Sequence, residues 1–232
     1  MKIFCDFDGT VTLKDSGDLF FQTFSQFEPY HTLLLYGKTT VREYYHTVVE
    51  KLPHPISDVE LDKFVDSLEI DPYFERFTTY CHEQNIPLTI ISDGFQIYIE
   101  KILKKHQIQL PVLSNHIRST GTKYEPIFPN AVEGCECFSA SCKRNAMLSH
   151  QLIDDIVVYI GDGRSDYCPV QFADIVFAKG NLDTYCARNH ISYYPFKSFF
   201  EVQSLLEQHR KKNLKKSKYS KISQRMAIYL QE

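Results

Sequence analysis

Lys2-Ile3-Phe4-Cys5 is followed directly by Asp6-Phe7-Asp8-Gly9-Thr10, and this change from apolar to acidic residues decides the fold. The first four residues are typical of a short buried strand, which Asp and Gly then end. In an open parallel sheet, ligands bind just beyond the carboxyl ends of the strands. Asp-x-Asp-Gly is also a common turn sequence, because Asp and Gly accept the backbone angles of turns. The other predicted strands must therefore show whether Asp6 and Asp8 have partners.

Three further apolar, β-branched runs predict buried strands at Pro87–Ile91, Asp155–Ile160 and Asp174–Phe177. Helices are predicted where apolar residues recur every three or four positions, at Phe95–His106, Lys143–Leu152 and Lys197–His209. Strands that alternate with helices imply parallel βαβ units. The fold class is therefore α/β, with a doubly wound parallel sheet.

Two segments depart from this alternation. The span from about Leu13 to Asp71 is rich in Leu, Phe and Tyr and lacks a β-branched run, so it predicts a helical cap inserted after the first strand. The span from about Asn115 to Ser141 is punctuated by Gly, Pro and Thr and predicts a loop or small hairpin insert. The expected organisation is a core over residues 1–13 and 72–209, a cap over residues 14–71 and an extension over residues 210–232.

Polar residues follow the other predicted strands as well. Ser92-Asp93-Gly94 comes after the second strand, Lys143 begins a later helix, and Gly161-Asp162-Gly163-Arg164-Ser165-Asp166 follows the third strand. Each has an ordinary alternative: a helix N-cap for Ser92, a solvated charge for Lys143 and a turn for Gly161–Gly163. Four such signals in order, each at a strand end or helix start, favour a shared site.

In chain order, these motifs resemble those of the haloacid dehalogenase superfamily of phosphohydrolases. Asp6–Thr10 is similar to the first motif, Ser92 to the second, Lys143 to the third, and Gly161-Asp162 with Asp166 to the fourth. The resemblance extends nearly to His209. It implies a Rossmann-like core and an enzyme that hydrolyses phosphoric monoesters.

The resemblance also implies roles for the acidic residues. Asp6 would attack phosphorus to give an aspartyl-phosphate, and Asp8 would protonate the leaving alkoxide and then deprotonate water. Mg²⁺ is the implied cofactor, with the Asp6 carboxylate, the Asp8 backbone carbonyl and the Asp162 carboxylate as ligands and Asp166 nearby. A substrate phosphate among these acids needs charge compensation, which is expected from Lys143, the Ser92 hydroxyl, the metal and backbone N–H groups near Phe7, Asp8 and Gly94.

The finer resemblance is to the branch with a helical cap, which includes the phosphoserine phosphatases. Gly161–Pro169 is similar to the fourth motif of phosphoethanolamine/phosphocholine phosphatases. The cysteines before Lys143 resemble that group and the 2-hydroxy-3-keto-5-methylthiopentenyl-1-phosphate phosphatases. The methylthiopentenyl-1-phosphate group is the favoured one, with the phosphoserine and phosphocholine/phosphoethanolamine groups as alternatives.

Candidate residues for substrate selectivity lie in the predicted cap. Asp15 and Asp18 stand where phosphoserine phosphatases usually carry a cap Glu, and they are expected either to face the substrate headgroup or to cap a helix. An acidic pair there would suit an amine-bearing substrate. Arg42, with one or two cap aromatics, is expected to close over the substrate.

Seven cysteines are an odd number without a dense framework, which predicts free thiols. Cys135, Cys137 and Cys142 would need a fourth ligand such as His116 or His150 to bind zinc, and their C-x-C-x₄-C spacing lacks paired C-x₂-C knuckles. Free, partly buried thiols are therefore the favoured interpretation. Core positions are expected for Cys5 and Cys168.

The charge is divided between the body and the tail. Residues 1–208 contain 18 Lys and Arg against 28 Asp and Glu, whereas residues 209–232 contain 8 against 1. A solvated extension is the favoured interpretation of the tail. Ile222, Met226 and Tyr229/Leu230 fall at helical spacing, so the alternatives are an amphipathic helix that docks within an oligomer or an anion-binding arm. Stacking aromatics are nearly absent there, which argues against a nucleic-acid partner.

The sequence predicts no secretory signal and no membrane span, and hence a cytoplasmic protein. Its expected partner is a small phosphorylated metabolite. The rival function classes are a phosphate-binding regulatory module without turnover and a nucleic-acid binder that uses the tail. The intact set Asp6, Asp8, Ser92, Lys143 and Asp162 argues against the first of these rivals.

Overall fold

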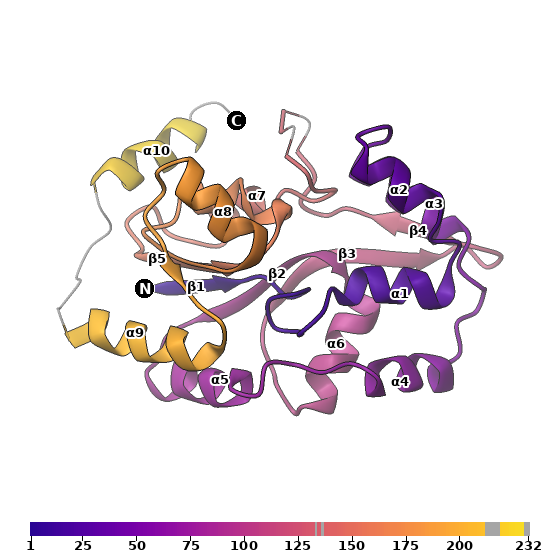
Figure 1. Cartoon of the computed structure of the whole chain (residues 1–232), viewed down its shortest axis with the longest axis horizontal. Helices are drawn as coiled ribbons and strands as arrows, with labels where there is room; N and C mark the ends of the chain where they lie inside the picture. The colour runs from indigo at the N-terminus through magenta and orange to yellow at the C-terminus, as the bar shows by residue number, and fades with distance from the viewer. Residues whose placement is uncertain (133, 136, 212–218, 230–232) are drawn as a thin grey trace.

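A seven-stranded sheet forms the centre of the molecule, with the strand order β4-β3-β2-β1-β5-β6-β7 (Figure 1). The computed structural model describes the whole chain except residues 133, 136, 212–218 and 230–232. The strands are β1 (Lys2–Cys5), β2 (Leu88–Phe95), β3 (Val112–Ser119), β4 (Tyr124–Ile127), β5 (Val157–Gly161), β6 (Ile175–Ala178) and β7 (Tyr194–Pro195). All paired strands are parallel except β3 and β4, which are antiparallel.

The central strand β1 pairs with β2 on one side and with β5 on the other. Its residues Ile3, Phe4 and Cys5 are buried, as is every residue of β5 and β6. Such strands need apolar side chains on both faces, which is why they appear in the sequence as short continuous apolar runs. The prediction of an α/β fold with a parallel sheet is confirmed.

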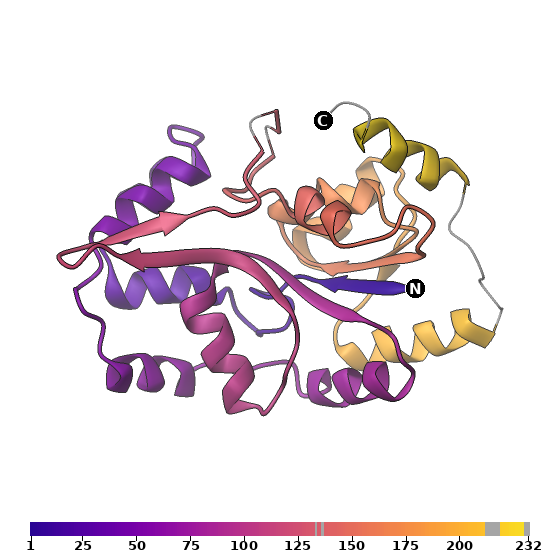
Figure 2. The same cartoon turned by 180° about the vertical axis from the view of Figure 1, so that it is seen from behind.

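Helices cover both faces of this sheet (Figures 1 and 2). The helices α5 and α9 contact each other on one face, and α7 and α8 pack against β2 and β6 on the other. The α-helices are α1 (Ser16–Phe24), α2 (Tyr30–Leu35), α3 (Val41–Glu50), α4 (Asp58–Asp66), α5 (Phe74–Glu83), α6 (Gln96–Lys105), α7 (Lys143–Ser149), α8 (Gly180–Arg188), α9 (Phe199–Lys211) and α10 (Tyr219–Tyr229). Two short 3₁₀ helices, η1 (Arg164–Asp166) and η2 (Pro169–Gln171), follow β5.

The segment between β1 and α5 folds into the helices α1 to α4, in agreement with the predicted helical cap. Capping boxes begin α3 and α4, where Thr40 pairs with Glu43 and Ser57 with Glu60. Phe20 of α1 packs edge-on against Phe64 of α4 and lies beside Tyr98 of α6. The apolar stripe of the cap is therefore buried on the core, which holds α1 close to the end of β2.

The expected insert over residues 115–141 contains a hairpin, as predicted, but it begins inside the main sheet, so its predicted boundary is wrong. Residues Val112–Ser119 form β3, which pairs with β2 and turns back into β4. This strand could not be predicted from an apolar run, because its buried centre is polar, with Ser114 and Asn115 in place of apolar residues. The hairpin extends to the cap (Figure 2), where the Tyr124 hydroxyl accepts a hydrogen bond from the Ile56 backbone N–H at 3.1 Å.

The expectation of a solvated tail is wrong for α10, which packs on the core. Arg225, one of the basic residues of the tail, is fully buried and pairs with Asp174 at 2.6 Å. It also donates to the backbone carbonyls of Asp155 and Phe172. Met226, predicted for the docked face, is 48% exposed. The contacts therefore lie within one chain, and Leu230 and residues 212–218 fall outside the described residues.

Among the described residues, no helix has the length and apolar character that crossing a membrane requires.

Candidate active site

The acidic residues predicted from the strand ends gather at the carboxyl edge of the sheet. Asp6 and Asp8 follow β1, and Asp162 follows β5. All three line a cavity of about 350 Å³ between the core and the cap. β1 lies between β2 and β5, so the three segments meet at the point where the chain order reverses direction across the sheet.

Lys143 lies between two carboxylates in the floor of this cavity. Its ammonium donates to Asp6 Oδ1 and, at 2.8 Å, to Asp166 Oδ1. The Lys143 side chain is 2% exposed, and the Asp6 and Asp166 side chains are 4% and 0% exposed. Burial lowers the pKa of Lys143, but the charges of Asp166 and Asp6 outweigh it and hold that pKa above its usual value. Lys143 therefore stays charged, and it is not the solvated surface charge that the sequence left open.

Asp166 holds the site together and does not face the cavity. Its carboxylate accepts hydrogen bonds from the Tyr159 hydroxyl at 2.7 Å and from the backbone N–H groups of Asp162 and Gly163 at 3.0 and 2.9 Å. Lys143 supplies a fourth donor. Because both oxygens are already occupied, Asp166 fits the outer position that the sequence analysis allowed and fits a direct metal ligand poorly.

Thr10 connects the first and fourth motifs. Its hydroxyl lies 3.0 Å from Asp6 Oδ2 and 2.9 Å from Asp162 Oδ1. The preceding Gly9 has a φ of +77°, and a Cβ there would stand 2.6 Å from Asp162 Oδ2. Only glycine fits this turn without moving the Asp162 carboxylate. The sequence placed Thr10 in the first motif without indicating these two contacts.

Asp8 occupies a different environment from Asp6. Its carboxylate accepts hydrogen bonds from the hydroxyl groups of Ser16 and Ser92, the latter at 2.7 Å. Burial and then the charge of Asp15 raise the pKa of Asp8 to about 6, against the effect of the two hydroxyl groups. A carboxyl group with this pKa can exchange a proton near neutral pH, as a general acid and base must.

Three predicted phosphate-binding positions differ in what they offer. Ser92 is buried behind Asp8 and accepts a hydrogen bond from the Gly94 N–H at 2.7 Å. Gly94 lines the cavity, and a Cβ there would stand 2.5 Å from Asp8 Oδ2. The Phe7 side chain is fully buried, so only its backbone is available to a ligand. The expected phosphate-binding roles of Ser92, Gly94 and Phe7 stay predictions.

Asp93, which was not predicted as a functional residue, fixes the loop in front of Lys143. Its buried carboxylate accepts hydrogen bonds from the backbone N–H groups of Ala140 and Ser141 and from the Asn115 amide. The loop is thereby tied to β2 and β3 just before α7 begins. The available signal was a charged residue directly after a predicted buried strand, because a carboxylate that becomes buried there needs partners.

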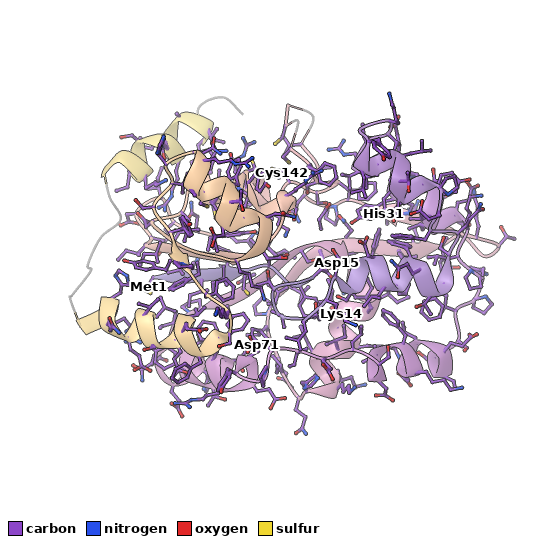
Figure 3. The ribbon with its side chains drawn as sticks, viewed as in Figure 1. Met1, Lys14, Asp15, His31, Asp71 and Cys142 are labelled. Atoms are coloured by element: carbon purple, nitrogen blue, oxygen red, sulfur yellow. The ribbon has the colours of Figure 1, made fainter. Side chains whose placement is uncertain are left out.

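The cap closes the far side of the cavity (Figure 3). Asp15 caps α1 by accepting from the Asp18 N–H at 2.8 Å, and His31 of α2 lies 3.5 Å from the Asp18 carboxylate. Asp15 and Asp18 line the cavity, so both expected roles of this pair, capping and facing the ligand, are compatible with the structure. Arg42 does not fit its expected role, because it donates to the carbonyls of Ala140 and Val132.

The donor set suits a hard cation. Carboxylate oxygens of Asp6 and Asp162 lie within 4.8 Å of each other, and Asp166 stands within the same distance in its outer position. Burial and then the charges of Asp6 and Asp166 raise the pKa of Asp162 to about 9. Lys143 cannot neutralise every acid in the cluster, and oxygen ligands of this kind are those that Mg²⁺ prefers.

The sheet, the strand-end acids and the buried lysine define a Rossmann-like α/β hydrolase. A family model described as haloacid dehalogenase-like hydrolase matches residues 3–168, so the chain belongs to that family. The resemblance inferred from the four motifs is thereby confirmed.

Relatives and solved structures agree with this assignment. A Bacillus cereus protein named 2-hydroxy-3-keto-5-methylthiopentenyl-1-phosphate phosphatase is 26% identical over 210 residues, which cover 89% of this chain and 96% of the relative. A Brevibacillus brevis protein of the same name is 28% identical, with 90% and 96% covered. A substrate-bound phosphoserine phosphatase structure superposes with a TM-score of 0.63 at 16% identity, covering 88% of this chain and 98% of the other. That structure supports the fold.

We predict that Asp162→Asn stabilises the protein when divalent ions are removed. The folded pKa of Asp162 lies above its unfolded value, so folding takes up a proton and stability falls as the pH rises from about 4 toward 9. In EDTA at pH 7.5 the variant should be more stable than the wild type by roughly 1–3 kcal/mol in urea unfolding. The gain should shrink as the pH approaches 4.

Asp154→Asn is the matched control, because Asp154 is exposed and follows α7 outside the site. Added Mg²⁺ should stabilise the wild type and this control but not Asp162→Asn. A destabilised Asp162→Asn variant in EDTA at pH 7.5 would contradict the account of charge repulsion.

Proposed function

We propose that the protein is a Mg²⁺-dependent phosphomonoesterase that hydrolyses a small phosphorylated metabolite through an aspartyl-phosphate on Asp6. The observation that carries this proposal is the contrast between two neighbouring carboxyl groups. Asp6 is held by Lys143 and Thr10, whereas Asp8 accepts hydrogen bonds from serine hydroxyl groups and has a pKa of about 6. The contrast suits Asp6 to the role of nucleophile and Asp8 to the role of general acid and base. Family membership favours hydrolysis over the alternative of a regulatory module.

The first half-reaction transfers the phosphoryl group to the enzyme. An oxygen of Asp6 forms a bond to phosphorus while the bond from phosphorus to the substrate oxygen breaks. Asp8 gives its proton to that oxygen, and the alcohol leaves. Lys143 balances the charge beside Asp6 throughout, which is the positioning and charge stabilisation that phosphoryl transfer needs.

The second half-reaction regenerates the acid. The carboxylate of Asp8 takes a proton from water as the water oxygen bonds to phosphorus, and the bond between phosphorus and Asp6 breaks. Inorganic phosphate leaves, and Asp8 is protonated for the next cycle. Asp6, the Asp8 backbone carbonyl and Asp162 are the groups proposed to hold Mg²⁺, which when bound supplies positive charge to the phosphate oxygens.

We predict that Asp6→Asn abolishes Mg²⁺-dependent phosphate release from a generic aryl phosphate, by at least roughly 10³-fold, since the amide is a poor nucleophile. The measurement is phosphate release alongside circular dichroism, which should show a folded variant. Asp154→Asn should keep wild-type turnover. Inactive wild-type protein, or a variant that retains turnover, would contradict the covalent mechanism.

The cap side of the cavity supports assignment to the methylthiopentenyl-1-phosphate phosphatase-like group. Apolar and aromatic side chains dominate this wall, including Phe21, Leu34, Leu35, Val41 and Tyr45. Such a wall favours a substrate with an apolar end, because it removes that end from water without leaving polar groups unpaired. Two relatives of this chain carry the name of that activity.

The acidic pair supports a second candidate, an amine-bearing substrate such as phosphoserine, phosphocholine or phosphoethanolamine. Asp15 and Asp18 line the same cavity. Burial and then the charge of Asp8 raise the pKa of Asp18 to about 6, so that it is mostly ionised at neutral pH. A cationic group of the substrate would find a partner there.

We predict that Leu34→Asp lowers kcat/KM for 2-hydroxy-3-keto-5-methylthiopentenyl-1-phosphate by roughly 10-fold or more, because it places a charge in the apolar wall. Leu33→Asp on the same helix is the matched control, since Leu33 is 40% exposed and does not line the cavity. Asp18→Asn should leave this substrate nearly unaffected.

The outcome that would favour the second candidate is a preference for phosphoserine, phosphocholine or phosphoethanolamine that Asp18→Asn removes. The measurement is kcat/KM for all four phosphates on the wild type and the three variants.

The remaining expectations stay predictions. They are a cytoplasmic location, a small phosphorylated metabolite as the partner and an oligomer formed through the tail. The docking of α10 on its own core lends no support to a nucleic-acid arm.

A further inference from the structure

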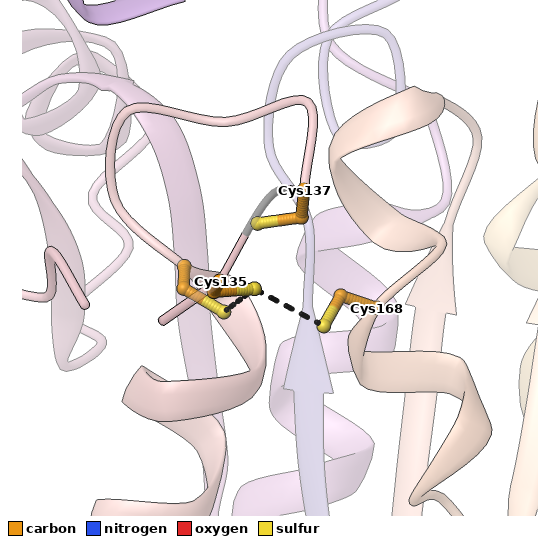
Figure 4. Close-up of side chains that lie close together, drawn as sticks. Cys135, Cys137 and Cys168 are labelled. Atoms are coloured by element: carbon orange, nitrogen blue, oxygen red, sulfur yellow. Dashed lines mark hydrogen bonds between the residues drawn. The ribbon is translucent and has the colours of Figure 1, made fainter. Parts of the chain in front are cut away.

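Three cysteines that are close in sequence meet a fourth, Cys168, beside the active site (Figure 4). Cys135 and Cys137 lie in the loop before α7, Cys142 is the residue directly before that helix, and Cys168 follows η1. Their Sγ atoms all lie within 4.8 Å of one another. Cys142 Sγ is 3.5 Å from Cys135 Sγ, which is 3.8 Å from Cys168 Sγ.

These separations exclude disulfides and match a tetrahedral metal site. A disulfide places its sulfur atoms about 2.05 Å apart. In a tetrahedron with Zn–S bonds of about 2.3 Å, neighbouring sulfur atoms are about 3.8 Å apart. The separations of 3.8 Å from Cys135 to Cys168 and 3.5 Å from Cys135 to Cys142 are close to that edge length.

The fourth candidate ligand is Cys168 and not one of the two histidines, His116 and His150, that the sequence suggested. His150 Nδ1 lies 2.9 Å from the Ala146 carbonyl, and His116 is exposed on the hairpin. Cys168, expected in the apolar core, is instead half-buried with its side chain directed toward Cys135 (Figure 4). The ligand count for a closed structural site is therefore complete with sulfur alone.

We propose that Cys135, Cys137, Cys142 and Cys168 bind one structural Zn²⁺ ion through their thiolates. Each thiol releases its proton to solvent as its sulfur coordinates the ion, with no change in oxidation state. Four sulfur ligands bind Zn²⁺ in preference to Mg²⁺, whereas the oxygen ligands beside Asp6 prefer Mg²⁺. Each site is therefore selective for a different ion.

The position of the cluster gives the ion a positioning role. Cys142 directly precedes Lys143, and Cys168 stands two residues after Asp166, so the ion would join the two segments whose side chains form the buried ion pair. Cys135 and Cys137 would fix the loop whose later part is held by Asp93. The ion would thereby hold Lys143 in register with Asp166 without touching the substrate.

The direct test is elemental analysis of the full chain purified without added metal. We expect about one zinc per chain in the wild type and in Asp6→Asn, and a loss of at least about tenfold in Cys168→Ser. Cys186→Ser is the matched control, because Cys186 is a buried free thiol outside the cluster, and it should retain the ion. Zinc retention in Asp6→Asn separates this site from the proposed phosphatase chemistry.

A second measurement does not depend on the variants folding. Co²⁺ exchanged into wild-type protein should give the visible absorption of tetrahedral thiolate coordination, and added Zn²⁺ should bleach it. Wild-type protein without zinc, with four reactive thiols or with a disulfide among these cysteines, would overturn the proposal. So would iron in place of zinc, or full zinc content in Cys168→Ser.

Discussion

The buried ammonium group of Lys143 is the interaction on which the rest of this structure depends. Asp6 and Asp166 are nearly inaccessible to solvent, and Asp162 lies within 4.8 Å of both. Ionised carboxylates in such a place repel one another and lose their hydration, so they require a cation and many hydrogen-bond donors. Lys143 supplies the cation from the protein itself, and Tyr159, Thr10 and the backbone after β5 supply donors. The single positive charge of Lys143 leaves part of the negative charge of these carboxylates uncompensated, and a divalent cation fits the site for that reason.

Much of the surrounding architecture serves to place that one side chain. Lys143 begins α7, and the loop before it is held by Asp93 to the sheet and by Arg42 to the cap. The cysteine cluster lies at the base of the same loop. Contacts between residues that are far apart in sequence thus join the motifs that follow three different strands. The parallel sheet sets the positions of the catalytic groups.

The sequence predicted those elements whose structure is determined by residues close together in the chain. Apolar runs that end in Asp or Gly revealed β1, β5 and β6, and residues at their ends revealed Asp6, Asp8 and Asp162. It did not reveal β3, whose buried centre is polar, nor the internal docking of Arg225. The partnership of Cys168 with the three earlier cysteines was also hidden, since 25 residues separate Cys142 from Cys168. These features depend on tertiary contacts that no periodicity records.

The most direct test of this account is the stability of Lys143→Met across pH in EDTA. Methionine keeps much of the volume but leaves the Asp6 and Asp166 carboxylates buried without their cation, which should cost about 3–5 kcal/mol at pH 7.5. Unfolding in urea should show this deficit shrinking as the pH falls toward 4, because Asp166, whose pKa burial raises, then takes up a proton. A deficit that stays constant with pH, or no deficit, would contradict the claim that Lys143 acts by charge compensation.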